Sequence, residues 1–131
     1  MIADTSAWVE YLRDTGSPTH LALRSRIQSG EAIATPAPVL LELLAGCGTE
    51  REAAAVARLL ARFEILGTGG LADFEDAALI HRTLRRRGLT IRSVLDCMVA
   101  AASLRMGRPL LARDRDYDMI ARHFELDLVR L

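Results

Sequence analysis

The stretch LLARDRDYD, residues 110–118, joins two apolar residues to a run of charged ones. Leu110 and Leu111 have the character of a short buried strand, whereas arginines and aspartates dominate the residues that follow. Either these charges neutralise one another in a solvated turn, or the strand carries carboxylates to a particular place in the fold. The order of the other elements along the chain decides between the two interpretations.

Short apolar segments alternate with helical segments along the whole chain. Strands are predicted at 1–4, 31–35, 63–67, 109–113 and 125–131, and helices at 5–12, 17–30, 36–48, 49–62, 71–87, 93–107 and 117–123. This alternation is typical of an α/β domain whose mainly parallel sheet is covered by helices on both faces. We therefore predict a three-layer α/β/α sandwich with a central sheet of four to five strands, formed as a single domain by residues 1–131.

The composition favours a globular protein without a strong charge bias. The chain has 131 residues, of which 50% are apolar, which suffices for one domain with a buried core. Its 17 basic residues, all of them arginine, balance 17 acidic ones, so the net charge neither indicates nor excludes a nucleic-acid partner. The N-terminal segment lacks the pattern of a signal peptide, and no apolar run reaches membrane-spanning length. We expect a cytoplasmic protein without a membrane partner.

Acidic residues stand at positions where an isolated charge would be costly. Asp4 and Asp114 follow predicted strands, and the carboxyl ends of parallel strands open onto one edge of a sheet. Glu42 and Asp96 lie inside apolar helical segments, although charged side chains are seldom buried unless they are paired or bound to metal. We therefore expect these four acids to converge.

Each acid also has a purely structural interpretation. Asp4 could cap the helix that follows it, and Asp96 lies three residues after Ser93, which is the spacing of a capping box. Glu42 could face solvent from its helix, and the aspartates after the fourth strand could be turn residues paired with adjacent arginines. A shared site accounts for all of these positions at once, whereas the structural interpretations must each hold separately.

Several carboxylates in one site repel one another unless a cation neutralises them or some take up protons. Oxygen ligands alone suit Mg²⁺ or Mn²⁺, whereas zinc sites usually include histidine or cysteine. Cys47 and Cys97 have no metal-like spacing with any histidine. A hard divalent ion can orient a water molecule, promote its deprotonation and stabilise charge on a phosphate under attack. The sequence therefore predicts a metal site suited to phosphate chemistry.

Four features, in this order and spacing, resemble the PIN domain, and in particular the VapC toxins of bacterial toxin–antitoxin pairs. They are MIADTSAW (1–8), Glu42 in its leucine-rich helix, TIRSVLDCMVAAAS (90–103) and LLARDRDYDMIA (110–121). The resemblance covers the whole chain and implies a PIN-like sandwich. It departs from the family pattern at Ala112, where a hydroxyl residue is common, and at Tyr117, where phenylalanine is usual. Neither departure removes an acid.

The resemblance implies that five acids, here called the acidic cluster, form the catalytic site: Asp4, Glu42, Asp96, Asp114 and Asp116. Of these, the four aspartates are expected to bind the metal. Thr5 and Ser6 would lie beside the first aspartate and hydrogen-bond a ligand or a metal-bound water. The strand at 109–113 would then deliver its carboxylates to this site.

The resemblance also implies an activity and its partners. The chain would be a Mg²⁺-dependent endoribonuclease toxin, with Mn²⁺ as an alternative ion, that cleaves cellular RNA such as tRNA or ribosomal RNA through metal-activated water. A homodimer and a VapB-type antitoxin are expected, and the helix at 5–12 carries aromatic residues that belong either to the core or to an antitoxin groove. The alternative is a catalytically inactive PIN-fold binding module. An aspartate-phosphorylated receiver or phosphatase is disfavoured, because the chain has no lysine and no second acid close after Asp4.

Basic residues that could bind RNA gather at the end of the predicted helix 71–87. Arg85 and Arg86 are the main candidates there, flanked by Arg82 and Arg87, although a helix C-terminus also favours cations. Arg113 is a candidate beside the acidic cluster, with Arg13 and Arg92 as further ones. The sequence leaves the two interpretations of the helix-end arginines open.

Overall fold

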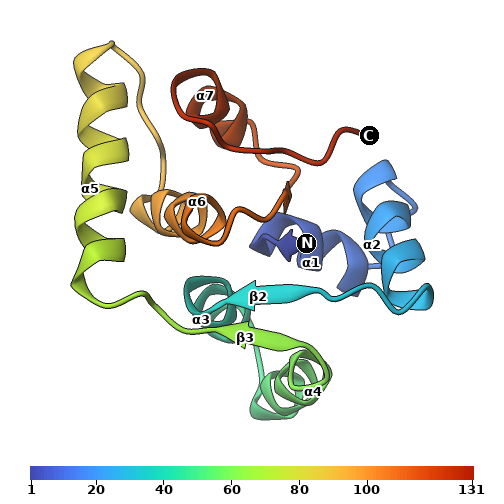
Figure 1. The fold of residues 1–131 in the computed structure, drawn as a ribbon. Helices are drawn as coiled ribbons and strands as arrows, with labels where there is room; N and C mark the ends of the chain where they lie inside the picture. Colours follow the sequence, from blue (N-terminus) through green and yellow to red (C-terminus); the bar gives the residue numbers. More distant parts are fainter.

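The computed structural model describes residues 1–131, and its four strands form one parallel sheet (Figure 1). The strands are β1 (Ile2–Ala3), β2 (Ala34–Pro36), β3 (Glu64–Leu66) and β4 (Leu110–Leu111), in the spatial order β3-β2-β1-β4. The helices are α1 (Thr5–Leu12), α2 (Pro18–Gln28), α3 (Ala37–Ala45), α4 (Glu50–Leu60), α5 (Leu71–Arg86), α6 (Val94–Met106) and α7 (Asp116–His123). The predicted α/β sandwich with a parallel sheet is confirmed.

The predicted last strand is the main difference from the sequence-based expectation. Residues 125–131 form a single parallel bridge, Leu110 to Leu128, instead of a strand. The Leu110 N–H donates to the Asp127 carbonyl at 2.8 Å, and the Val129 N–H donates to the Leu110 carbonyl at 2.9 Å. Because β4 is only two residues long, the tail has one pairing position on it and cannot extend the ladder.

The register of β1 and β4 determines where the functional edge of the sheet lies. Ala3 pairs with Leu111, and the Asp4 N–H donates to the Leu111 carbonyl at 3.0 Å. The chain leaves both strands at this edge, towards α1 from β1 and towards α7 from β4. Asp4 and the acids after β4 therefore start from neighbouring backbone positions.

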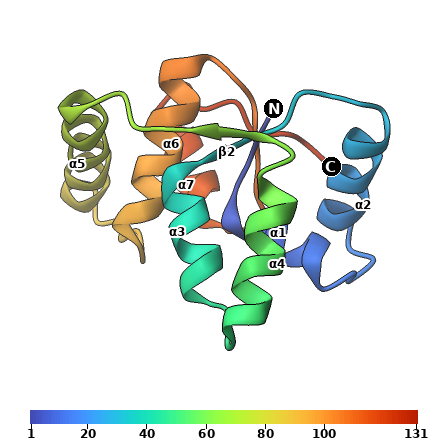
Figure 2. The ribbon, with the colours of Figure 1, turned by 90° about the horizontal axis from the view of Figure 1, so that it is seen from below.

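Helix α6 is the central helix of the fold. It contacts α3, α5 and α7, and both views show it between α5 and the rest of the molecule (Figures 1 and 2). Its sequence is apolar almost all round, as burial against several neighbours requires. Most of the helix is buried, and its first turn carries Asp96.

The core also fixes α1 against the sheet. Trp8 is fully buried, its indole N–H donates to the Thr35 hydroxyl of β2 at 3.1 Å, and its ring centroid lies 5.2 Å from that of Phe63. A buried tryptophan needs such an acceptor for its polar atom. Trp8 therefore belongs to the core and is not available to a partner. None of the helices combines the length and apolar character that crossing a membrane requires.

Candidate metal centre

Three aspartates meet beyond the carboxyl end of β4. Asp96, Asp114 and Asp116 each offer a carboxylate oxygen, and these oxygens lie within 4.8 Å of one another. Asp116 is buried in the first turn of α7 and Asp96 in the first turn of α6, whereas Asp114 is partly open to solvent. The structure thus brings together acids that are separated by up to 20 positions in the sequence.

Asp4 is buried beside these three residues, and both of its carboxylate oxygens are held. Its Oδ2 accepts hydrogen bonds from the Ser6 N–H at 2.9 Å and from the Ser6 hydroxyl at 2.6 Å, so Asp4 does cap α1. Its Oδ1 accepts from the Tyr117 hydroxyl at 2.7 Å. The Oδ1 atom keeps an acceptor site for a further ligand, whereas both sites of Oδ2 are used by Ser6, so the surrounding bonds fix the side from which Asp4 could meet a ligand.

Glu42 does not face solvent from α3. Its Oε1 is buried without a hydrogen-bond partner, and the buried hydroxyl oxygen of Thr5 lacks one as well. Burial raises the pKa of Glu42, and the negative charges of Asp4 and Asp114 add to this rise, while the nearby Thr5 hydroxyl partly opposes it. An unsatisfied buried polar atom costs about 1–3 kcal/mol, so these two oxygens fit a site that is completed by a ligand.

Among the aspartates of the acidic cluster, Asp96 has the pKa that is raised most clearly. Burial raises its pKa to about 7, and the charges of Asp4, Asp114, Glu42 and Asp116 contribute in that order. Its carboxylate forms no capping box, because the Ser93 hydroxyl caps α6 by accepting from the Leu95 N–H at 3.2 Å and no hydrogen bond joins Asp96 to the Ser93 N–H. The carboxylate of Asp96 is therefore free of partners within the protein.

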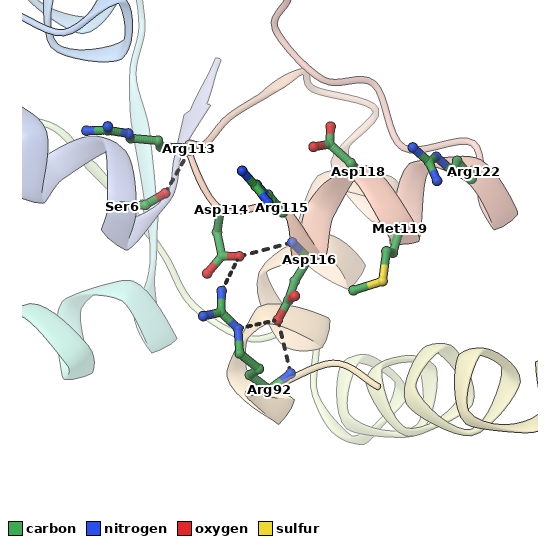
Figure 3. Close-up of a pocket in the computed structure, with 9 residues that line it drawn as sticks. All are labelled: Ser6, Arg92, Arg113, Asp114, Arg115, Asp116, Asp118, Met119 and Arg122. Carbon is green, nitrogen blue, oxygen red and sulfur yellow. Dashed lines mark hydrogen bonds and ion pairs between the residues drawn. The ribbon is translucent and has the colours of Figure 1, made fainter. Parts of the chain in front are cut away.

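One arginine contacts the acidic cluster, and it is not the one adjacent in sequence. Arg92 Nη2 lies 2.7 Å from Asp114 Oδ1, and Arg92 Nε lies 3.5 Å from Asp116 Oδ2 (Figure 3). Arg113 instead pairs with Glu10 of α1, and Arg115 forms no ion pair. The interpretation of 113–118 as a self-neutralising turn is therefore wrong, because the counter-charge comes from the loop before α6.

Two contacts of the acidic cluster were not predicted from the sequence, those of Arg92 with Asp114 and of Tyr117 with Asp4. From the sequence, Arg92 is predicted only as a further candidate for RNA binding. Tyr117 is notable only because phenylalanine is usual at its position in the family. Tyr117 carried one usable signal, since a hydroxyl that replaces an apolar position in a buried helix requires an acceptor. Arg92 carried no such signal, because its partners depend on the path of the loop before α6.

A pocket of about 830 Å³ opens over Asp114 and Asp116 (Figure 3). Its lining combines these acids with basic residues from three segments: Arg92, Arg113, Arg115 and Arg122. Arg85 and Arg86 do not line it, and they lie exposed at the end of α5 without an ion pair. The basic residues nearest to the acidic cluster are therefore those of the pocket.

The donor set fits a hard divalent ion. All available ligands are carboxylate or hydroxyl oxygens, one arginine pairs with two of the five acids, and two buried oxygens lack partners. Mg²⁺ and Mn²⁺ prefer such oxygen ligands and usually keep part of their water shell. The absence of histidine and thiol groups from the cluster does not suit zinc.

Comparison with known proteins identifies the family of the chain. The sequence profile of the PIN domain matches residues 1–123. The chain belongs to the PIN-domain family. It is 41% identical over 124 residues to the ribonuclease VapC11 of Mycobacterium tuberculosis (strain H37Rv), across 93% of this chain and 92% of that protein. The VapC ribonuclease Mb1587 of Mycobacterium bovis matches to the same extent.

Solved structures with the same fold include toxin–antitoxin complexes. VapBC2 from Rickettsia felis, bound to a DNA fragment from its promoter, matches with a TM-score of 0.78 and 19% identity, over 99% of this chain and 97% of that one. DNA-bound VapBC from Salmonella typhimurium matches with a TM-score of 0.77 and 20% identity, over 98% and 95%. At these identities the likeness concerns the PIN fold.

Proposed function

We propose that this protein is a Mg²⁺-dependent endoribonuclease, the toxin of a VapBC-type pair, which acts in the cytoplasm as one PIN domain of residues 1–131. The observation that carries this proposal is the convergence of the acidic cluster with a single arginine as its counter-charge. Five acids with only one arginine paired to them are costly to assemble unless a divalent ion balances the remaining charge. The identity to VapC ribonucleases supports RNA as the substrate.

Each acid has a distinct part in this proposal. Asp96, Asp114 and Asp116 would hold the ion, and Asp4 would complete its ligand set from the end of β1. When bound, Mg²⁺ supplies a Lewis acid that lowers the pKa of a water and offsets the charge of the phosphate. Ser6 and Tyr117 orient Asp4, and the buried, unpartnered oxygens of Glu42 and Thr5 would take up a ligand or a metal-bound water beside it.

Basic residues of the pocket would bind the RNA backbone. Arg113 and its neighbours line the same pocket as Asp114 and Asp116, and arginine binds phosphate through a planar fork of donors. Arg85 and Arg86, at the end of α5, would extend this surface along the RNA. We propose tRNA or ribosomal RNA as the substrate class; VapC20 of Mycobacterium tuberculosis, a structural relative at 24% identity and a TM-score of 0.63 over 94% of this chain and 95% of that one, is described as cleaving the sarcin–ricin loop.

A VapB-type antitoxin would dock next to the active site. A groove of about 560 Å³ between α1, α3 and α4 is lined by Val9 and Leu12 and also by Thr5 and Glu42. A segment bound there would reach the acidic cluster directly. A homodimer would use a different face, where exposed Phe74 and Val94 line an apolar hollow between α5 and α6.

Cleavage of purified tRNA and ribosomal RNA tests the proposal. The protein should cut RNA with Mg²⁺ or Mn²⁺ and lose this activity with a chelator, and Asp4→Asn should be inactive while it remains folded. Asp118→Asn is the matched control, because Asp118 lies exposed in the pocket lined by Asp114 and Asp116 but outside the acidic cluster. If the wild type binds RNA but never cuts it, or if Asp4→Asn cuts it equally well, the catalytic proposal fails and a binding module remains.

A further inference from the structure

Arg92 makes the contacts that a bound cation would make. Its guanidinium lies on Asp114 Oδ1 at 2.7 Å and on Asp116 Oδ2 at 3.5 Å (Figure 3). These two residues supply two of the three carboxylates that could hold a metal ion together. No other arginine forms an ion pair with the acidic cluster. The guanidinium and a metal ion would therefore compete for the same acids.

The backbone of Arg92 is anchored independently of its side chain. Its N–H donates to Asp116 Oδ2 at 3.0 Å, the preceding Ile91 is buried, and the following Ser93 caps α6. The side chain itself is 73% exposed. The guanidinium can therefore leave the acids by side-chain rotation alone, while the loop stays in place.

Charge determines which cation prevails. A guanidinium carries one positive charge, and that of Arg92 pairs with Asp114 and Asp116 but not with Asp96. A divalent ion brings twice the charge and can approach several carboxylates at once. Two cations on the same carboxylates repel each other, so binding of one weakens binding of the other.

We propose that Arg92 is an internal counter-ion, which occupies Asp114 and Asp116 in the metal-free protein and is displaced when a divalent ion binds. This inference rests on the proposed function, since it requires the acidic cluster to bind metal. Arg92 is then a positioning residue that holds the acids assembled before the ion arrives. Its displacement leaves a free guanidinium in a pocket already lined by arginines, where a phosphate group can accept its hydrogen bonds.

Titration of the chelator-treated full chain with Mn²⁺, followed by the paramagnetic resonance signal of free Mn²⁺, tests this exchange. Arg92→Gln should bind Mn²⁺ about tenfold more tightly than the wild type, because the competing cation is gone. Arg115→Gln is the matched control: it removes the same charge from the same pocket, but Arg115 pairs with no acid. It should tighten Mn²⁺ binding by about twofold or less, through long-range electrostatics alone.

The metal-free proteins supply a second readout. Without metal, Arg92→Gln should melt at a lower temperature than Arg115→Gln, and the addition of Mn²⁺ should remove the difference. Arg92→Lys retains the charge and should show Mn²⁺ affinity between the wild type and Arg92→Gln. If the wild type binds Mn²⁺ but Arg92→Gln and Arg115→Gln bind it with equal affinity, the exchange of Arg92 for the metal is overturned, while the metal site itself stands. If none of these proteins binds Mn²⁺, both the exchange and the proposed metal-dependent activity are overturned.

Discussion

Two buried aspartates of this fold, Asp73 and Asp96, occupy equivalent local positions and have opposite surroundings. Each lies in the first turn of a long helix, where the helix dipole favours a negative charge. Asp73 accepts from Arg105 Nε at 2.9 Å and from the Gly69 N–H at 2.6 Å. Asp96 accepts no hydrogen bond, and burial together with four other acids raises its pKa to about 7. The two aspartates occupy the same helical position, but only the charge of Asp73 is balanced by an arginine and a hydrogen-bond donor.

The surroundings of Asp73 are built tightly around its charge. A Cβ added at Gly69 would lie 2.7 Å from both Asp73 Oδ1 and Arg105 Nε, so the chain approaches this pair as closely as glycine allows. The pair ties the loop between β3 and α5 to α6. Its one acid is balanced by one arginine, whereas the acidic cluster sets five acids against one. The comparison indicates that the balanced pair of Asp73 and Arg105 stabilises the fold, whereas the excess negative charge of the acidic cluster is suited to binding a cation.

The largest expected effect separates the two aspartates by activity. Asp96→Asn should lower RNA cleavage by at least about 100-fold, because even changes around a metal ligand cost 10–100-fold. Asp4→Asn and Glu42→Gln should behave in the same way. Asp73→Asn, assayed well below its melting temperature, should change cleavage less than about threefold. Initial cleavage rates at saturating Mg²⁺ measure all four, and near-full activity of Asp96→Asn would show that this residue does not serve the metal.

Stability should show the reverse order. Asp73→Asn leaves Arg105 without its partner and should cost about 2 kcal/mol of unfolding free energy. Asp96→Asn removes a repelling charge and should leave the metal-free protein as stable as the wild type or more stable. Urea denaturation in the presence of a chelator measures both values. A larger loss for Asp96→Asn than for Asp73→Asn would break the comparison.

The pH dependence of stability provides a smaller effect of known sign. The folded-state pKa of Asp96, about 7, lies above the ordinary value of 3.8 for this carboxyl group. Its contribution to stability is therefore complete below pH 3.8 and is lost as the pH rises towards 7. Metal-free wild type should therefore lose about 1 kcal/mol relative to Asp96→Asn between pH 4.5 and pH 8, after allowance for solvent screening. Parallel stability curves for the two proteins would show that Asp96 is not perturbed.

The smallest expected effect concerns RNA affinity. Replacement of Arg85 and Arg86 by Ala should weaken binding to unrelated RNAs and reduce the salt dependence by about one unit of slope per lost phosphate contact. RNA affinity should be measured at several salt concentrations in the inactive Asp4→Asn background, so that the RNA is not cleaved during the measurement. An unchanged slope would assign both arginines to the C-terminus of α5, where cations are favourable without any RNA.

The sequence predicts the positions of the acids better than their partners. Asp4 and Asp114 follow short apolar strands, and the rule that parallel strands end at one edge brings them together before any side chain is placed. Asp96 and Glu42 are conspicuous as acids in apolar helices. These arguments depend on spacing of a few residues, which sequence periodicity reports directly.

The partners depend on contacts that cross the chain. Arg92 reaches Asp114 across 22 positions, and Tyr117 reaches Asp4 across 113. Whether a loop side chain turns towards an acid depends on the path of that loop, which local periodicity does not record. The same limit explains residues 125–131, whose alternating pattern predicts a strand although β4 offers only a single pairing position.

Thermal unfolding with and without Mg²⁺ or Mn²⁺ tests the central claim most directly, namely that the unbalanced acids bind a divalent ion. Wild type and Asp73→Asn should both gain stability, by about 2.7 kcal/mol at a metal concentration 100 times the dissociation constant. Asp96→Asn should gain much less. If the wild type gains nothing from either ion, or if Asp96→Asn gains as much as Asp73→Asn, the acidic cluster is not a metal site and the account is contradicted.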